Sequence, residues 1–225
     1  MSATSDQLQQ AIQCGDASKL RELLKENAIL ANAPLANGVS PVMLAVYYGR
    51  SDLAQILLQN GAEEDIYVAA ATGNSRRVAE ILDRRPELLN AFAPDGHVPL
   101  GLAAFFGKRD VVKLLLDRGA DVNVASQNAQ KVTPLHGAVN RGDAIITKQL
   151  LDRGAHVNPR QERGFTPLFS VAAVGNIELM DLLVKHGADV NARTDDGKTA
   201  YDFAVERKQE KAAEWLKTKA AAQSA

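Results

Sequence analysis

Four histidines and one cysteine are the side chains of this 225-residue sequence best suited to bind a transition metal or to act as base and nucleophile: His97, His136, His156, His186 and Cys14. A zinc site needs such ligands at short, regular spacing, and a general base needs its reacting partner within hydrogen-bond reach. No histidine stands at ligand spacing from another histidine or from the cysteine. We therefore expect no metal site, no catalytic residue and no cofactor, since nucleophile-elbow, phosphate-loop and dinucleotide motifs are also missing from the sequence.

Two runs of carboxylates could in principle do acid-base chemistry. Glu63-Glu64-Asp65 precedes an apolar run that begins at Ile66, and Asp195-Asp196 precedes Gly197. Carboxylates are favoured at helix starts by the helix dipole, and Asp is common in turns. Local backbone preference therefore explains both runs better than catalysis does.

The charge balance also argues against several classes of partner. Twenty-six basic and 27 acidic residues leave a formal net charge of -1, which predicts no nucleic-acid binding. The longest uncharged apolar stretch, residues 98–107, is half of what a bilayer requires, and residues 1–15 lack the pattern of a signal peptide. We expect a cytoplasmic protein without membrane insertion, whose stability comes from packing because its single cysteine can form no internal disulfide.

The elements that position these residues follow from a ladder of prolines and glycines. Each of four prolines stands eight residues before a glycine, in the pairs Pro41 and Gly49, Pro99 and Gly107, Pro134 and Gly142, and Pro167 and Gly175. The prolines are 58, 35 and 33 residues apart. A recurring period near 33 predicts an array of stacked repeats instead of a globule.

The clearest repeat begins at Thr133. Its hydroxyl can cap a helix whose first position, Pro134, lacks the amide that would otherwise have no partner. Gly142 suits the end of that helix, and a second amphipathic helix follows around residues 145–151. Such short helices are marginal alone in water, so they must stack to persist.

These residues closely resemble the ankyrin repeat. Thr133-Pro134-Leu135-His136 matches the opening of its pattern, and Gly-Ala-Asp-Val-Asn at residues 119–123 and 187–191 matches its close. The resemblance covers roughly residues 5–218. It implies an all-α solenoid with short hairpin-like fingers, and it implies that His136 ties neighbouring loops together by hydrogen bonds.

Aligning the glycines predicts about seven stacked helix pairs in a single domain over residues 1–219, followed by a flexible tail at 220–225. The pairs are expected near residues 5–27, 40–61, 64–86, 98–119, 133–154, 166–187 and 199–218. We expect the protein to be a monomer.

One finger is predicted to be missing before residue 66. Gly61 leads through Glu63 to Asp65 almost directly into the apolar helix at residues 66–72, leaving no room for a connector. In ankyrin arrays the last two residues of the first helix of each pair face the concave side. Those positions here include Tyr47, Tyr48, Ala71, Thr72, Phe105, Phe106, Asn140 and Arg141.

We therefore predict a shallow apolar groove over Ala71 and Thr72, between a tyrosine wall and a phenylalanine wall. Walls two helix layers apart would be separated by about 16 to 20 Å, which is wide enough for an extended peptide or a helix. A second interpretation stays open, in which the aromatic residues only pack against the next layer.

The resulting hypothesis is a non-enzymatic protein-interaction module, acting as an adaptor, scaffold or regulator, that binds a segment of an unknown partner protein on its concave surface. The finger residues Phe92, His97, Arg163 and Phe165 would tune specificity. The alternative is an enzyme subunit or enzyme regulator whose active site is completed by a partner. His97 beside a carboxylate in a pocket would favour that alternative.

Overall fold

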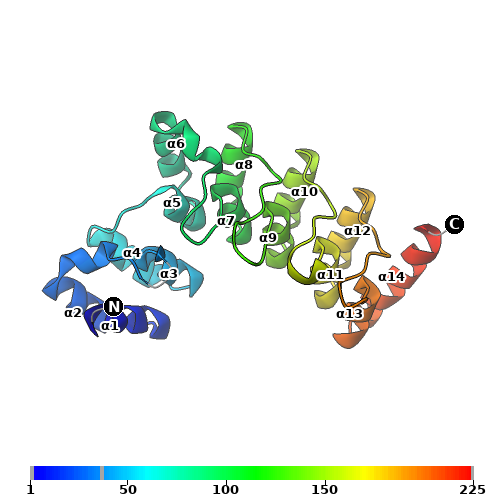
Figure 1. Cartoon of the computed structure of the whole chain (residues 1–225), viewed down its shortest axis with the longest axis horizontal. Helices are drawn as coiled ribbons and strands as arrows, with labels where there is room; N and C mark the ends of the chain where they lie inside the picture. Colours follow the sequence, from blue (N-terminus) through cyan, green and yellow to red (C-terminus); the bar gives the residue numbers. More distant parts are fainter. Residues whose placement is uncertain (1–2, 36–37, 224–225) are drawn as a thin grey trace.

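The protein is an elongated stack of helices, seen in a computed structural model that describes residues 3–35 and 38–223 (Figure 1). Within those ranges the chain forms seven pairs of α-helices and no β-strand, which confirms the expected all-α solenoid. The pairs are α1 (Ala3–Cys14) with α2 (Ala17–Glu26), α3 (Pro41–Tyr47) with α4 (Ser51–Gln59), α5 (Ile66–Thr72) with α6 (Ser75–Arg84), α7 (Pro99–Phe105) with α8 (Arg109–Asp117), α9 (Pro134–Arg141) with α10 (Ala144–Asp152), α11 (Pro167–Val174) with α12 (Ile177–Lys185), and α13 (Ala200–Glu206) with α14 (Glu210–Gln223).

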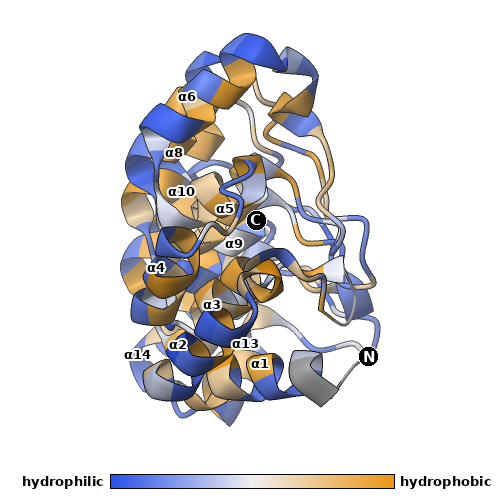
Figure 2. Cartoon of the chain, turned by 90° about the vertical axis from the view of Figure 1, so that its left-hand side faces the viewer, coloured by the Kyte–Doolittle hydropathy of each residue, from blue (hydrophilic) through white to orange (hydrophobic). Residues whose placement is uncertain are grey.

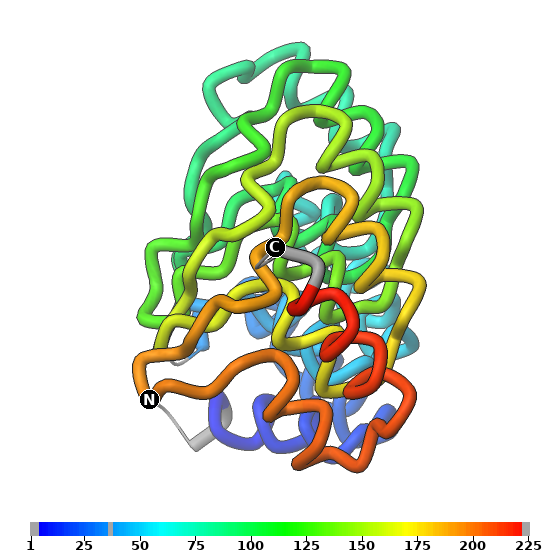
Figure 3. The backbone as a smooth tube through the Cα atoms, turned by 90° about the vertical axis from the view of Figure 1, so that its right-hand side faces the viewer, coloured from blue at the N-terminus to red at the C-terminus, as the bar shows by residue number. Residues whose placement is uncertain are grey.

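The odd-numbered helices α1 to α13 form an inner row, and the even-numbered helices form an outer row. Each inner helix packs on the next inner helix, as α7 does on α9 and α11 on α13. Figure 2 shows the outer helices along one side of the molecule and the connecting loops along the other. Seen from the C-terminal end, the successive loops nest one behind another (Figure 3). Short single-turn helices begin three of the loops or lie within them, at η1 (Ala28–Asn32), η3 (Pro86–Asn90) and η4 (Glu162–Gly164).

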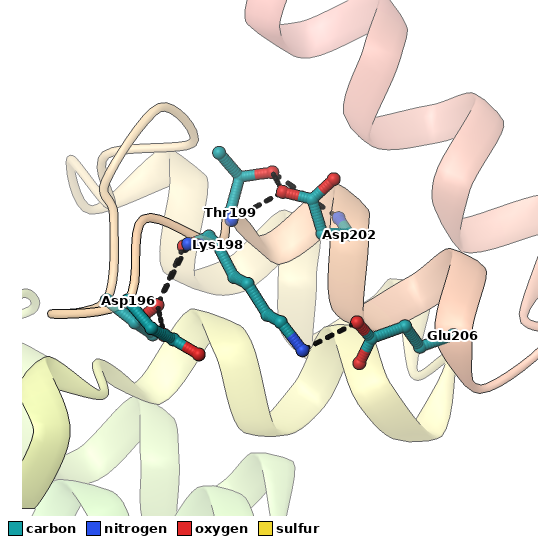
Figure 4. Close-up of polar contacts among 6 residues, drawn as sticks. Asp196, Lys198, Thr199, Asp202 and Glu206 are labelled. Atoms are coloured by element: carbon teal, nitrogen blue, oxygen red, sulfur yellow. Dashed lines mark hydrogen bonds and ion pairs between the residues drawn. The ribbon is translucent and has the colours of Figure 1, made fainter.

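Capping boxes start two of the inner helices. At α9 the Thr133 hydroxyl accepts the amide N–H of His136, and the ring of His136 reaches back to the amide of Thr133. At α13 the carboxylate of Asp202 takes the place of the imidazole and accepts the Thr199 N–H at 2.7 Å (Figure 4). Each box satisfies two backbone donors that a helix start would otherwise leave unpaired.

The last helix runs further than the sequence suggested. Residues 220–223, where a flexible tail was expected, belong to α14, and residues 224–225 lie outside the described residues. Alanine and glutamine have high helix propensity, and Ala220 is half-buried against the core, so the helix gains packing by continuing.

Asparagines at the end of each connector tie one repeat to the next. Asn123 donates from Nδ2 to the carbonyl of Gly154 at 3.2 Å, and its Oδ1 accepts the N–H of His156 at 2.8 Å. The same two-way bond joins Asn32 to Gly61 and Glu63, and Asn158 to Gly187 and Asp189. The fingers are linked as well, since backbone amides at their tips bond to the preceding finger: Gln127 to Gly96, Glu162 to Gln130, and Asp195 to Arg163.

The finger expected to be missing is indeed missing. Residues 60–65 pass straight from α4 to α5, and Asp65 caps α5 by accepting the Val68 N–H at 2.8 Å. The finger of the second repeat therefore lies next to that of the fourth: a Cβ placed on Gly38 would be 3.2 Å from Pro94 Cβ. The stack changes direction at this point (Figure 1).

The core divides at the same place. One cluster of buried side chains runs from α1 to α5 and also includes Leu102 of α7, and the other runs from α5 to α14. Helix α5 contributes to both, with Val68 and Ala71 in the first cluster and Ile66, Ala69 and Ala70 in the second.

His136 should make the protein sensitive to mild acid. The side chain is fully buried, and burial lowers its pKa to about 4, against the opposing effect of the Phe165 and Pro159 carbonyls. Because the unfolded chain binds this proton near pH 6.5, stability is full above pH 6.5 and falls as the pH drops toward 4. Through His136, the free energy of unfolding should fall by about 2 kcal/mol between pH 7 and pH 5. Urea unfolding at both pH values measures this loss.

His136→Gln is the matching variant for the acid experiment. The variant should be less stable than the wild-type protein at pH 7, but its free energy of unfolding should fall less between pH 7 and pH 5. Burial lowers the pKa of His97 as well, so a slope of the same sign will remain in the variant. Equal losses in the wild-type and variant proteins would show that His136 is not the acid-sensitive group.

Asn123→Ala should cost about 0.5 to 1.5 kcal/mol, because it removes the bonds to the exposed His156 amide and Gly154 carbonyl, which water can then reach. Asn60→Ala is the control, since Asn60 Nδ2 bonds only within α4, to Ile56 O at 2.8 Å. The comparison is made by chemical denaturation. An Asn123→Ala loss no larger than that of the control would contradict a linking role for the asparagine.

Candidate functional site

A depression of about 720 Å³ lies on the concave side, where the ends of α3, α5, α7 and α9 meet. Seven of the residues expected to form the site line it: Tyr47, Ala71, Thr72, Phe105, Phe106, Asn140 and Arg141. Its far side is formed by α4, through side chains including Ala54, Gln55 and Leu58. The sequence pattern thus located the surface from the inner helices, and it missed the contribution of α4.

The expected separation of the two aromatic walls is wrong. The rings of Tyr47 and Phe106 are 5.7 Å apart between centroids, and Phe106 meets Phe105 edge-on at 5.1 Å. Two features allow this contact: no finger stands before α5, and Ala71, although it lines the depression, is small and almost completely buried. The rings of Tyr47, Phe106 and Phe105 form an aromatic bridge across α5, and the depression lies beside this bridge.

The Tyr47 hydroxyl joins the two parts of the stack. It donates to Asp95 Oδ2 at 2.5 Å, and Asp95 Oδ1 also accepts the His97 N–H at 3.2 Å. Burial, together with the Asp95 carboxylate, raises the pKa of Tyr47 well above its usual range. The hydroxyl therefore stays protonated, and it holds α3 against the finger of the fourth repeat.

A second depression of about 430 Å³ adjoins the first on the finger side. The two share Tyr47, Phe105 and Asn140, and we call them together the concave trough. The finger side adds Gly101, Leu102, Gln130, Val132, Gln161, Glu162 and His97. Gln130, Gln161 and Glu162 were not among the expected site residues, because only the stacking of the fingers brings these distant turns together.

His97 lines the same depression as Glu162, but among the hydrogen bonds and ion pairs of the described residues none joins the His97 ring to a carboxylate. The Nε2 atom of His97 lies 3.3 Å from the side-chain nitrogen Nδ2 of Asn128. Burial lowers the pKa of His97, and the Asp95 charge only partly opposes this. Asp95 bonds to the backbone N–H of His97, so this carboxylate fixes the turn.

Four of the expected site residues lie elsewhere. Tyr48 is exposed and Phe92 is half-buried, and neither residue lines the two depressions. Arg163 is at a finger tip, where its carbonyl accepts the Asp195 N–H. Phe165 packs on Phe203 and Phe169 at 5.1 and 5.8 Å, so at this position the aromatic ring packs between repeats.

Phe105 owes its position to a glycine on the neighbouring helix. A Cβ on Gly137 of α9 would lie 3.1 Å from the Phe105 backbone nitrogen. The two inner helices can pack this closely only because Gly137 has no side chain, so the Phe105 ring projects into the concave trough, 46% exposed.

Family comparison agrees with this architecture. Ankyrin repeats (3 copies) match residues 66–161 and 135–224, and a single Ankyrin repeat matches residues 37–69. The chain belongs to the ankyrin-repeat family. Ankyrin repeats are in general protein-interaction modules and not enzymes, which indicates a protein partner without identifying it.

Several larger proteins contain a similar ankyrin array. Ankyrin repeat and SAM domain-containing protein 6 of Rattus norvegicus is 30% identical over 141 residues, 63% of this chain and 12% of the relative. Neurogenic locus notch homolog protein 1 of Homo sapiens is 30% identical over 170 residues, 75% of this chain and 6% of the relative. The Transient receptor potential cation channel subfamily A member 1 homolog of Caenorhabditis elegans is 28% identical over 176 residues, 74% of this chain and 14% of the relative. The chain therefore spans only a small part of each relative.

In the part of the chain that the structure describes, no three His, Cys, Asp or Glu residues gather closely enough to hold a metal ion. Over the same residues, no helix combines the length and apolarity that crossing a membrane requires.

Tyr47→Phe should loosen the first two ankyrin repeats without disturbing the aromatic bridge. The change removes the hydroxyl donor to Asp95 and keeps the ring beside Phe106, so we expect a loss of about 1 to 2 kcal/mol. Hydrogen exchange should quicken in α1–α4 relative to α9–α14. Tyr201→Phe, on α13, is the control. Uniform or unchanged exchange would show that the hydroxyl does not join the two parts.

Proposed function

We propose that this ankyrin array is a non-enzymatic adaptor, scaffold or regulator that binds a segment of a partner protein in the concave trough. The observation that carries the proposal is the exposure of Phe105 and Tyr47, at 46% and 37%, on the boundary between two adjoining depressions. Large aromatic side chains beside a hollow are the commonest anchors of protein interfaces. Leaving them in water has a cost that a bound segment would remove.

The shape of the trough favours an extended segment. Its two depressions, of about 720 and 430 Å³, lie side by side across the ends of the inner helices. Each could receive one or two side chains of a peptide that passes over Phe105. The side-chain amides of Asn140, Gln130 and Gln161 line the route and can pair with the backbone N–H and C=O groups of such a peptide.

The Tyr47–Asp95 bond supports the same proposal, because a binding surface gains affinity when its parts are already in place. The bond fixes one wall of the trough to the finger that forms its edge. Asp95 is also held by His97, so the wall does not need to reorganise when a partner segment arrives.

Phe105→Ala should weaken peptide binding about tenfold or more, while Tyr48→Ala should change it little. The two rings are similarly exposed, at 46% and 49%, but only Phe105 lines the trough. Peptides are selected from a random library displayed on phage with the wild-type chain as bait. Their affinities for the three proteins are then measured by fluorescence anisotropy. Peptides that bind all three equally would contradict the proposed site.

A further inference from the structure

The charges of the concave trough are unevenly distributed. The larger depression is lined by two cations, Lys108 and Arg141, and by no carboxylate among its described lining residues. The smaller depression, on the finger side, is lined by Glu162 and by no lysine or arginine among its own. The aromatic residues Tyr47 and Phe105 lie where the two meet.

The two cations are held in place by packing against glycines of the preceding repeat. A Cβ on Gly73 would be 3.0 Å from Lys108 Cδ, and one on Gly107 would be 3.3 Å from Arg141 Nε. Both glycines have a left-handed φ, 94° and 69°, so these positions favour a residue without a side chain. The stems of Lys108 and Arg141 occupy the space that results, which limits where their charged ends can go.

The two carboxylates that line a neighbouring hollow with these cations form no ion pair with either of them. Asp143, beside them, accepts Arg109 Nε at 2.9 Å and the amides of Ile145 and Ile146 at 3.0 Å each. Asp110 lines the neighbouring polar hollow together with Lys108 and Arg141. Among the ion pairs of the described residues, neither Lys108 nor Arg141 has a carboxylate within 4 Å, whereas Arg109 does.

We infer that the partner segment carries an apolar or aromatic anchor beside Phe105 and an Asp or Glu next to it, bound by Lys108 and Arg141. The inference rests on the proposed function and adds the chemistry of the partner. Charge complementarity assigns the direction: the acidic end lies toward α8 and α10, and the other end lies toward Glu162 and the fingers. A segment with its carboxylate at the finger end would meet the like charge of Glu162.

The same random phage library tests this chemistry. Peptides selected on the wild-type chain should share an aromatic or aliphatic residue with Asp or Glu close by, always on the same side. The double variant Lys108→Glu/Arg141→Glu should bind these peptides at least about tenfold more weakly. Selection on that variant should give Lys or Arg in place of the acid while keeping the anchor.

The matched control reverses two lysines on the outer face of the same repeats, Lys113→Glu/Lys148→Glu. These lysines pair with Asp117 and Asp152 at 2.6 Å, away from the trough. The control has the same net charge as the test variant, so it reports non-specific attraction. It should bind the selected peptides nearly as well as the wild type, and circular dichroism should show equal helix content in all variants.

Three results would overturn the inference, and they can be told apart. Peptides that need Phe105 but show no acidic preference and tolerate the Lys108/Arg141 reversal would refute the partner chemistry and leave the proposed function standing. An equal loss of peptide affinity in the test and control variants would show that only the net charge of the protein matters. If no selected peptide depends on Phe105, the proposed function fails, and the inference fails with it.

Discussion

The whole molecule depends on how α5 is packed, because this helix joins two hydrophobic cores without a finger in front of it. Its small side chains divide between the cores, with Val68 and Ala71 facing the first repeats and Ala69 and Ala70 facing the later ones. The short connector at residues 60–65 receives an asparagine link from Asn32, but its own asparagine, Asn60, bonds back to Ile56 instead of onward to the next repeat. The direct contact of Tyr47 with Phe106 and the bond from Tyr47 to Asp95 hold the two parts together instead.

The same packing creates the surface for which we propose a binding role. Where a finger would otherwise stand, side chains from α3 and α7 come together and leave a hollow bounded by α4 on one side and by the later fingers on the other. An array of regular repeats has similar layers along its whole length. Here the irregular junction makes one place different from the rest, with exposed rings, two cations on one side and a carboxylate on the other. This irregular junction is therefore the place where we propose that a partner is recognised.

The fold could be predicted from the sequence because the residues that build each repeat act locally. Thr133, Pro134 and Gly142 start and end a helix through bonds to their own neighbours, so their spacing is enough to locate it. The missing finger could be predicted for the same reason, from the short interval between Gly61 and Ile66. Inner-helix residues that line the trough could be predicted where they occupy the last positions of the first helix in each repeat.

Contacts between repeats were harder to predict. The distance between Tyr47 and Phe106 depends on how closely two layers approach over α5, which no single repeat specifies. Phe165 looked like a finger residue available to a partner, but its ring packs against Phe203 of the next repeat. Lys108 was missed because it follows the glycine that ends a helix, and only the stacking over Gly73 directs it into the trough.

The most direct test of a concave binding site is a map of amide chemical shifts on adding a peptide selected with the wild-type chain. The proposal predicts changes concentrated at the ends of α3, α5, α7 and α9, around residues 47–49, 71–73, 105–108 and 140–142, and at the finger residues 130 and 161–162. Changes confined to the outer helices, or spread evenly along the stack, would contradict it.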